Sequence, residues 1–176
     1  MKSEKGFTLL ELMTTLGIAA ILLSVAVPGL QSFVMNSRQS SAVNQMVSSI
    51  HLARNTAVTR NSWVTVCASD DGATCTNAAW SGGWLTFADA DRDQMVDAGE
   101  EVLSVSSEVE SLNIASAQFP AAISYAGNGR VIAPIANGVA GSFAFCDRRG
   151  TAKAKVVNIE LTGRPTLSAN AVANCG

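Results

Sequence analysis

The sequence is poor in the residues on which enzyme chemistry depends. Its 176 residues include one histidine, His51, and contain neither a phosphate-binding glycine loop nor a G-x-S-x-G nucleophile motif. The four cysteines lack the C-x-x-C spacing that is typical of a zinc site. Internal repeats and Ser- or Pro-rich linkers are also absent. These absences favour one domain without a zinc centre, and we predict that the protein is not an enzyme.

Charge is almost missing from the first part of the chain. The segment from Phe7 to Val27 has 21 residues and one charged side chain, Glu11. At roughly 1.5 Å per residue, a helix of this length spans about 30 Å, the thickness of the hydrocarbon core of a bilayer. We therefore predict a transmembrane and assembly helix over residues 7–30, with the remainder of the chain outside the cytoplasm.

Glu11 is an anomaly in this apolar segment. A carboxylate in hydrocarbon is penalised by several kcal/mol unless it has a partner. Removal of residues 1–6 would create one, because the new amine of Phe7 would be positively charged and could pair with Glu11 of a neighbouring copy. A secretory signal peptide cut near Ala26 and an ordinary single-span anchor also fit the hydropathy, but neither accounts for the carboxylate.

Residues 6–11, GFTLLE, follow a short leader with two lysines and resemble the class III signal of type IV pilins and type II secretion pseudopilins. The resemblance implies that residues 1–6 are a leader, and that a prepilin peptidase cleaves between Gly6 and Phe7 and methylates the new amine. It also implies an assembly charge pair between Phe7 and Glu11 of adjacent subunits. Pro28 matches the proline that permits local melting of the helix in filaments of this family.

The four cysteines all lie in the part that a membrane crossing would place outside the cytoplasm. An even number in an oxidising compartment predicts two disulfides, and three connectivities are open. We favour the local pairs, Cys67 with Cys75 and Cys146 with Cys175. The second pair would tie the C-terminal tail to a central strand.

After Pro28 the chain changes from uniformly apolar to patterned. Six apolar residues recur at three- and four-residue steps, as in an amphipathic helix: Val43, Met46, Val47, Ile50, Ala53 and Ala57. Polar residues, including Ser49 and Arg54, are predicted away from this stripe. We predict an amphipathic helix over residues 31–60 that continues into the head and packs its apolar face there.

Residues 61–176 have the pattern of strands and are predicted to form a β-rich globular head. Stretches rich in β-forming residues alternate with turns that contain Gly, Asn and Pro: 63–67, 83–88, 101–105, 122–125, 131–133, 142–146 and 155–161. One long helix followed by many short strands predicts an α+β fold. The second half of the helix would pack against a mostly antiparallel β-sandwich.

The segment from Trp63 to Leu103 contains Cys67, Cys75 and the run WSGGWLTFAD at 80–89, and it resembles the GspH/FimT/FimU branch of minor pilins and minor pseudopilins. The resemblance implies a protein that helps to initiate a type IV pilus and lies at or near its tip. It implies a bacterial inner-membrane location with a periplasmic head, and other pilins or pseudopilins as partners. The alternatives are a minor pseudopilin of a type II secretion system and a DNA-binding minor pilin for DNA uptake.

Acidic residues gather in the middle of the chain: residues 70–110 hold ten of them and one basic residue, a net charge of −9. Five occupy the first, third, fifth, ninth and twelfth places of a twelve-residue segment: Asp89, Asp91, Asp93, Asp97 and Glu100. This is the ligand spacing of an EF-hand calcium loop, and calcium is the one cofactor that the sequence suggests. Gln94 replaces the glycine of the sixth place, so a solvated acidic loop is the alternative.

Basic residues gather near the C-terminus, where residues 121–176 carry a net charge of +4. Five lie within 17 residues: Arg148, Arg149, Lys153, Lys155 and Arg164. Such a cluster can neutralise phosphates, and FimT-like proteins implicated in DNA uptake carry a Gly-Arg-x-Arg motif. Here the segment 163–166 is GRPT, which lacks the second arginine, and no aromatic stacking platform accompanies it. DNA binding is therefore a weaker hypothesis than a solvated basic face.

Overall fold

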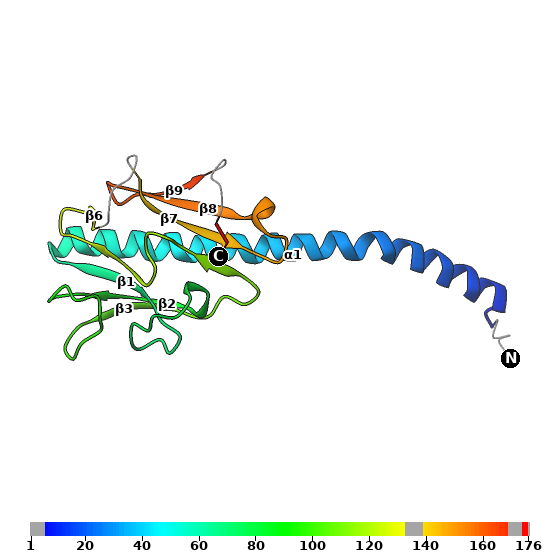
Figure 1. Cartoon of the computed structure of the whole chain (residues 1–176). Helices are drawn as coiled ribbons and strands as arrows, with labels where there is room; N and C mark the ends of the chain where they lie inside the picture. Colours follow the sequence, from blue (N-terminus) through cyan, green and yellow to red (C-terminus); the bar gives the residue numbers. More distant parts are fainter. Residues whose placement is uncertain (1–5, 133–138, 169–173, 176) are drawn as a thin grey trace. The chain divides into compact units, whose positions relative to one another are not determined.

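The structure is a computed structural model that describes residues 6–132, 139–168 and 174–175 (Figure 1). The predicted leader lies outside the described residues except for Gly6, and so does Ala133 of the predicted strand 131–133. The chain divides into two compact units, Met1–Arg38 and Gln39–Gly176.

One helix, α1 (Leu9–Arg60), has 52 residues and is continuous through Pro28. From Gly6 to Arg38 no residue is buried, whereas eight residues of α1 from Gln39 onward are. The predicted stripe is confirmed, because five of its six residues are buried and Val47 packs against the same core. The compact unit begins at Gln39, so the head-packing part of the helix is shorter than the predicted segment 31–60.

The strands of the second unit form two antiparallel sheets. The five-stranded sheet has the order β3-β2-β1-β5-β6, with the bounds β1 (Val64–Ala68), β2 (Trp84–Ala88), β3 (Val102–Ser106), β5 (Ala122–Tyr125) and β6 (Val131–Ile132). The four-stranded sheet has the order β4-β7-β8-β9, with the bounds β4 (Asn113–Ala115), β7 (Val139–Cys146), β8 (Lys155–Glu160) and β9 (Pro165–Ser168). Short 3-10 turns lie at Trp80–Gly82 (η1) and Thr151–Lys153 (η2). The predicted α+β fold is confirmed, although β4 and β9 were not predicted.

A single main core combines α1 with both sheets. Met46 and Ile50 of the helix are fully buried, and so are Trp84 of β2 and Phe143 of β7. In Figure 1 the head part of α1 runs between β1–β3 on one side and β7–β9 on the other. Each large apolar side chain buried in this way contributes about 1.5 to 3 kcal/mol, so the helix is an integral part of the head.

The two disulfides are the local pairs favoured from the sequence. Cys67 of β1 is bonded to Cys75, eight residues later, and Cys146 of β7 is bonded to Cys175, 29 residues later. The carbonyl of Cys175 also accepts a hydrogen bond from the Asn113 side-chain amide of β4 at 2.7 Å. The segment at Cys175 is therefore attached both to β7 and to the neighbouring strand β4.

Candidate functional site

The first turn of α1 contains Glu11. Thr8 precedes the helix, and its hydroxyl accepts a hydrogen bond from the backbone N–H of Glu11 at 3.3 Å. The sequence T-x-x-E at 8–11 is the pattern of a capping box. Thr8 was not predicted as a site residue, but this motif could have identified it as the N-terminal cap of α1. Phe7 lies two residues before the first residue of α1. An amine created there by cleavage after Gly6 would lie beside the positive end of the helix.

The first part of α1 exposes an apolar surface. Leu9 is 77% exposed and Ile21 is 69% exposed, and the helix is long and apolar enough to cross a membrane. Soluble proteins rarely expose a continuous apolar surface of this kind unless it is a binding surface. A surface of this kind is suited to contact with lipid or with the helices of other subunits. Melting of the helix at Pro28 stays a prediction.

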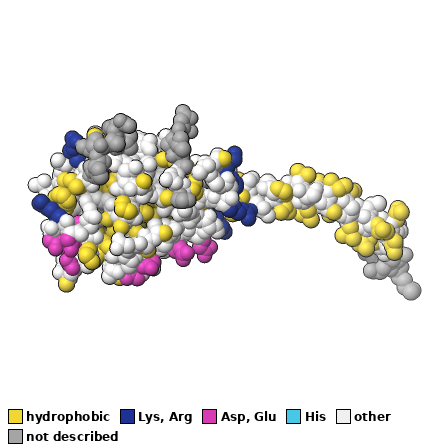
Figure 2. All heavy atoms as spheres, in the orientation of Figure 1, with side chains coloured by type: hydrophobic (Ala, Val, Ile, Leu, Met, Phe, Trp, Pro, Cys, Tyr) yellow, Lys and Arg dark blue, Asp and Glu magenta, His cyan; other side chains and the backbone are white. Residues whose placement is uncertain are grey.

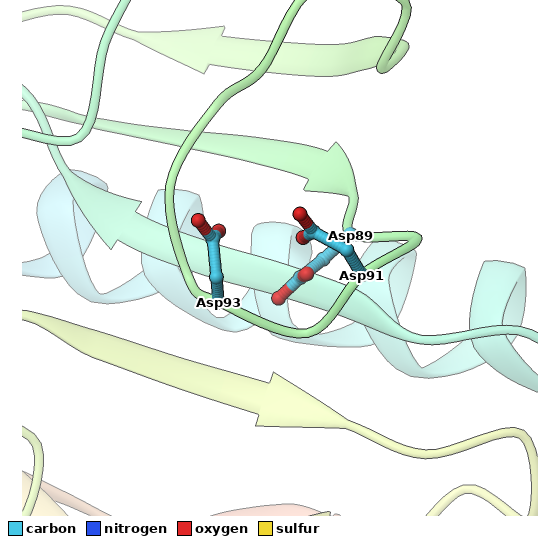
Figure 3. Close-up of side chains that lie close together, drawn as sticks. All are labelled: Asp89, Asp91 and Asp93. Carbon is cyan, nitrogen blue, oxygen red and sulfur yellow. The ribbon is translucent and has the colours of Figure 1, made fainter.

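The acidic turn after β2 brings together three of the five predicted carboxylates. Ligand oxygens of Asp89, Asp91 and Asp93 lie within 4.8 Å of one another (Figure 3). Asp89 is fully buried, and its carboxylate accepts hydrogen bonds from the Thr65 hydroxyl at 2.6 Å and from the Arg92 backbone N–H at 2.7 Å. Both oxygens of Asp89 thus already have protein donors, which orient the turn.

The other two predicted ligands do not join this cluster. Glu100 instead accepts hydrogen bonds from the backbone N–H groups of Ala90, at 2.7 Å, and Asp97, at 3.1 Å, so it closes the turn upon itself. Gln94 has φ of 66°, the left-handed conformation for which an EF-hand uses glycine. The five-ligand arrangement is therefore not formed among the described residues, and calcium binding stays a prediction centred on three aspartates.

The five predicted basic residues are not brought to one place. Arg148, Arg149 and Lys153 lie between β7 and β8, and Lys155 begins β8. Arg164 lies in the turn after β8, at the opposite end of this six-residue strand, about 20 Å away. The single basic cluster inferred from sequence proximity is therefore divided into two.

Two of these basic residues also have partners within the head. Arg149 forms an ion pair with Asp147, with 2.5 Å between Nη2 and Oδ2, and this contact lowers the pKa of the Asp147 carboxyl below its usual value. The Nζ of Lys155 donates to the Ser40 hydroxyl at 2.7 Å. In the face shown in Figure 2, acidic side chains gather along the lower side of the head while Lys and Arg lie in separate groups at its two ends. DNA binding stays a prediction, and the positive surface available for it is smaller than the sequence suggested.

Two polar helix residues that were not predicted to be buried hold α1 in the head. The side-chain amide of Gln39 donates to the carbonyls of Phe145, at 2.8 Å, and Lys153, at 3.0 Å. Ser49 was assigned to the solvent side of the helix, but it is 5% exposed and accepts a hydrogen bond from the indole N–H of Trp84 at 2.9 Å. The assignment was wrong because a polar side chain can be buried when it finds a partner, and spacing alone does not reveal one.

Comparison with family models gives two matches. The model described as "Type II transport protein GspH" matches residues 42–163, and the model described as "Prokaryotic N-terminal methylation motif" matches residues 1–27. Together they cover the transmembrane-like segment and most of the head, including every cysteine but Cys175.

Comparison with curated proteins finds relatives among pilins. The pilin-like protein PilA1 of Thermus thermophilus is 33% identical over 99 residues, which are 56% of this chain and 57% of that protein. A fimbrial protein of Pseudomonas aeruginosa is 38% identical over 58 residues, which are 33% of this chain and 37% of that protein. The chain therefore spans little more than half of the first relative and less than half of the second.

Comparison with solved structures finds the same fold in two minor subunits. The type IV minor pilin FimU of Pseudomonas aeruginosa has a TM-score of 0.60 at 18% identity, over 77% of this chain and 92% of that one. The minor pseudopilin EpsH of the type 2 secretion system of Vibrio cholerae has a TM-score of 0.50 at 9% identity, over 75% of this chain and 97% of that one. At these identities the similarity extends to the fold.

Proposed function

Because the chain belongs to the GspH family of minor pilins and pseudopilins, we propose that it is a minor type IV pilin that helps to initiate a pilus and is incorporated at or near its tip. The observation that carries the proposal is the first part of α1, an exposed apolar helix with a single carboxylate in its first turn. The N-terminal methylation motif matched over residues 1–27 supports cleavage between Gly6 and Phe7.

The assembly step uses two groups. Before assembly, a subunit in the membrane has only its own methylated Phe7 amine and its own Glu11 carboxylate, without a neighbour to pair with. In the growing filament, the amine of one subunit pairs with Glu11 of its neighbour and removes an uncompensated charge from an apolar environment. The loss of one member of a buried charge pair costs about 3 to 5 kcal/mol, which is enough to exclude a subunit from the filament.

Two substitutions of Glu11 separate this pairing from the capping of α1. Glu11→Val removes the charge and the capping-box side chain, whereas Glu11→Gln removes the charge but retains a side chain that suits the capping box. We expect both variants to fall at least about tenfold in the sheared pilus fraction, measured by immunoblotting, and to stay folded in the membrane. Normal incorporation of Glu11→Gln would show that capping, and not charge pairing, is the role of Glu11.

A pilus and a secretion pseudopilus remain the two settings to distinguish. The pilin-like and fimbrial names of the curated relatives favour a pilus, whereas the description of the GspH model favours secretion. Deletion of the gene should abolish surface pili and twitching while leaving protein secretion intact. Lost secretion with normal piliation would instead identify a minor pseudopilin.

The proposed location is the bacterial inner membrane before assembly, with the head in the periplasm. Two disulfides support an oxidising compartment for the head. The proposed partners are the prepilin peptidase, the membrane and other pilin-type subunits. Binding of DNA at the tip is a weaker alternative, which a mobility-shift assay with the full chain in detergent would test. Arg164→Ala should weaken any such binding.

A further inference from the structure

The outer edge of β3 lacks the protection that sheet edges usually have. Among the described residues β3 pairs with β2 alone, so its other edge has no strand partner. Its sequence, Val-Leu-Ser-Val-Ser, contains no charge and no proline, and Val102 and Val105 are 39% and 51% exposed. Proteins normally protect such edges with charges, proline or very short strands, because an open edge invites pairing with another chain.

The other edge strands differ in this respect. The described part of β6 has two residues and β4 has three, which leaves few free backbone groups. β9 begins with Pro165, which has no N–H to donate. β3 has five residues and none of these devices, so it is the most open edge among the described strands.

A groove lies beside this open edge, on the side of the sheet that faces α1. It has a volume of about 530 Å³ and lies between the helix and the side chains of Ser104 and Ser106. The helix lines it with uncharged residues: Ser41, Asn44, Gln45, Ser48, Ser49 and Leu52. Side chains of the inner strands, such as Trp84 of β2, fill the corresponding space closer to the centre of the sheet. The groove is thus the space into which the helix-facing side chains of one further strand would fit.

A buried hydroxyl without a hydrogen-bond partner lies next to β3, on the strand β2. Thr86 is opposite Ser104 in the ladder, so the two side chains share a face of the sheet. Thr86 is fully buried, and its hydroxyl has no hydrogen-bond partner in the structure. The described residues that line the groove itself carry hydroxyl and amide groups, with Leu52 and no charged side chain, which favours small, uncharged side chains in a segment that enters it.

We propose that β3 and this groove accept an extended, uncharged segment of a neighbouring pilin-type subunit as an added strand. The inference rests on the proposed function for the identity of the partner. Backbone hydrogen bonds along β3 would supply the affinity, and the alternate side chains of the added segment would enter the groove and supply the specificity. The contact would join one head directly to another, separately from the pairing of the N-terminal helices.

The first test is site-specific photo-crosslinking of the full chain in cell envelopes. A photoreactive residue at Gln45, on the rim of the groove, should form an adduct with another protein that carries an N-terminal methylation motif, identified by mass spectrometry. The matched control is His51, which is exposed on the same helix but does not line the groove. Equal adducts at both positions, no adduct at Gln45, or capture of a second copy of this chain would overturn the proposal.

The second test fills the groove. Ser106→Phe should lower the yield of the Gln45 adduct by about tenfold. The phenylalanine ring would occupy the groove, and the displaced strand would lose about two backbone hydrogen bonds to β3. Thr166→Phe, on the edge strand of the other sheet, should leave it unchanged. Unaltered melting temperatures of both variants in detergent would show that each head is folded. An undiminished adduct in folded Ser106→Phe would refute the assignment.

The outcome is distinguishable from that of the proposed function. Filaments that contain the protein but give no Gln45 adduct would refute strand addition alone. A Gln45 adduct with a pilin-type subunit in membranes of the Glu11→Val variant would support strand addition even where incorporation is lost.

Discussion

The two parts of α1 differ in where their apolar surface is covered. In Leu9–Arg38 no side chain is buried, although large apolar residues such as Leu16 and Leu22 are frequent. In the part from Gln39 to Arg60, apolar side chains are fewer, but most lie on one stripe that is buried against the two sheets; Leu52 and Val58 lie outside it and are exposed. Composition alone would rank the first part as the more strongly core-forming.

The difference shows that burial in this chain is divided between two stages. The second part of α1 obtains its burial during folding, from residues of the same chain. The first part is left exposed by folding, and we expect lipid or other subunits to cover it, as in an assembly helix. One continuous helix thus serves as a folding element at one end and as an association element at the other.

Matched side-chain truncations in the two parts of α1 should give the largest difference in the stability of the head. Ile50→Ala should lower the free energy of unfolding of the head by about 4 kcal/mol, because it leaves a cavity in a fully buried site. Leu16→Ala, at a residue that is 61% exposed, should change it by less than about 0.5 kcal/mol. Urea titration of the full chain in detergent, followed by tryptophan fluorescence, measures both. Similar losses would show that the first part also contributes to the head.

Removal of the disulfides tests the head alone. Cys146 and Cys175 are 29 residues apart, so their bond should contribute about 3.5 kcal/mol by constraining the unfolded chain. Cys67 and Cys75 are eight residues apart, and their bond should contribute about 2.5 kcal/mol. Double serine variants, compared by the same urea titration, should rank in this order. If the serine variants also lost their retention in the membrane fraction to the same extent, a role of the disulfides confined to the head would be contradicted.

Acidification should lower the stability of the head by less than the removal of a disulfide does. The Arg149 guanidinium lowers the folded-state pKa of Asp147, so this contribution to stability is present above the unfolded-state pKa, about 4, and is lost as the pH falls through the folded value. The head of Asp147→Asn should therefore lose less stability than the parent between about pH 4 and pH 2. Melting curves over this range measure the difference, and parallel curves would contradict it.

Calcium should have the smallest effect, and only on the head. If Asp89, Asp91 and Asp93 bind the ion, calcium at five times its dissociation constant should stabilise the head by about 1 kcal/mol. Asp91→Asn should remove this gain with little loss of basal stability, because Asp91 is exposed. Calorimetric titration of the full chain in detergent gives the measurement. No heat and no rise in melting temperature at millimolar calcium would dispose of the site.

The sequence predicted those features that depend on periodicity or on compartment. The three- and four-residue spacing of Met46, Ile50 and Ala53 was sufficient to identify the buried face of α1, and an even number of exported cysteines was sufficient to predict two disulfides. The strands β4 and β9 were missed because the first has three residues and the second begins with a proline, which ordinarily argues against a strand.

The sites of the head were predicted less well, because spacing along a loop does not fix the direction of its side chains. Asp97 and Glu100 match the EF-hand positions, yet the carboxylate of Glu100 turns to backbone N–H groups of its own loop. Arg164 is close to Lys155 in sequence, but the strand β8 separates them in space. Ser49 was misplaced because its partner, Trp84, lies 35 residues away along the chain.

The contacts of Gln39 have a mechanical consequence. In a subunit that is held by its helix and pulled by its head, tension would pass along α1 to Gln39, whose side-chain amide is bonded to the carbonyls of Phe145 and Lys153. Behind it, the buried stripe from Ala42 to Ala57 lies parallel to the pulling direction, so its contacts would be loaded together in shear instead of peeling one at a time. If the protein has the proposed function, this arrangement would keep the head on its helix while the filament is under tension.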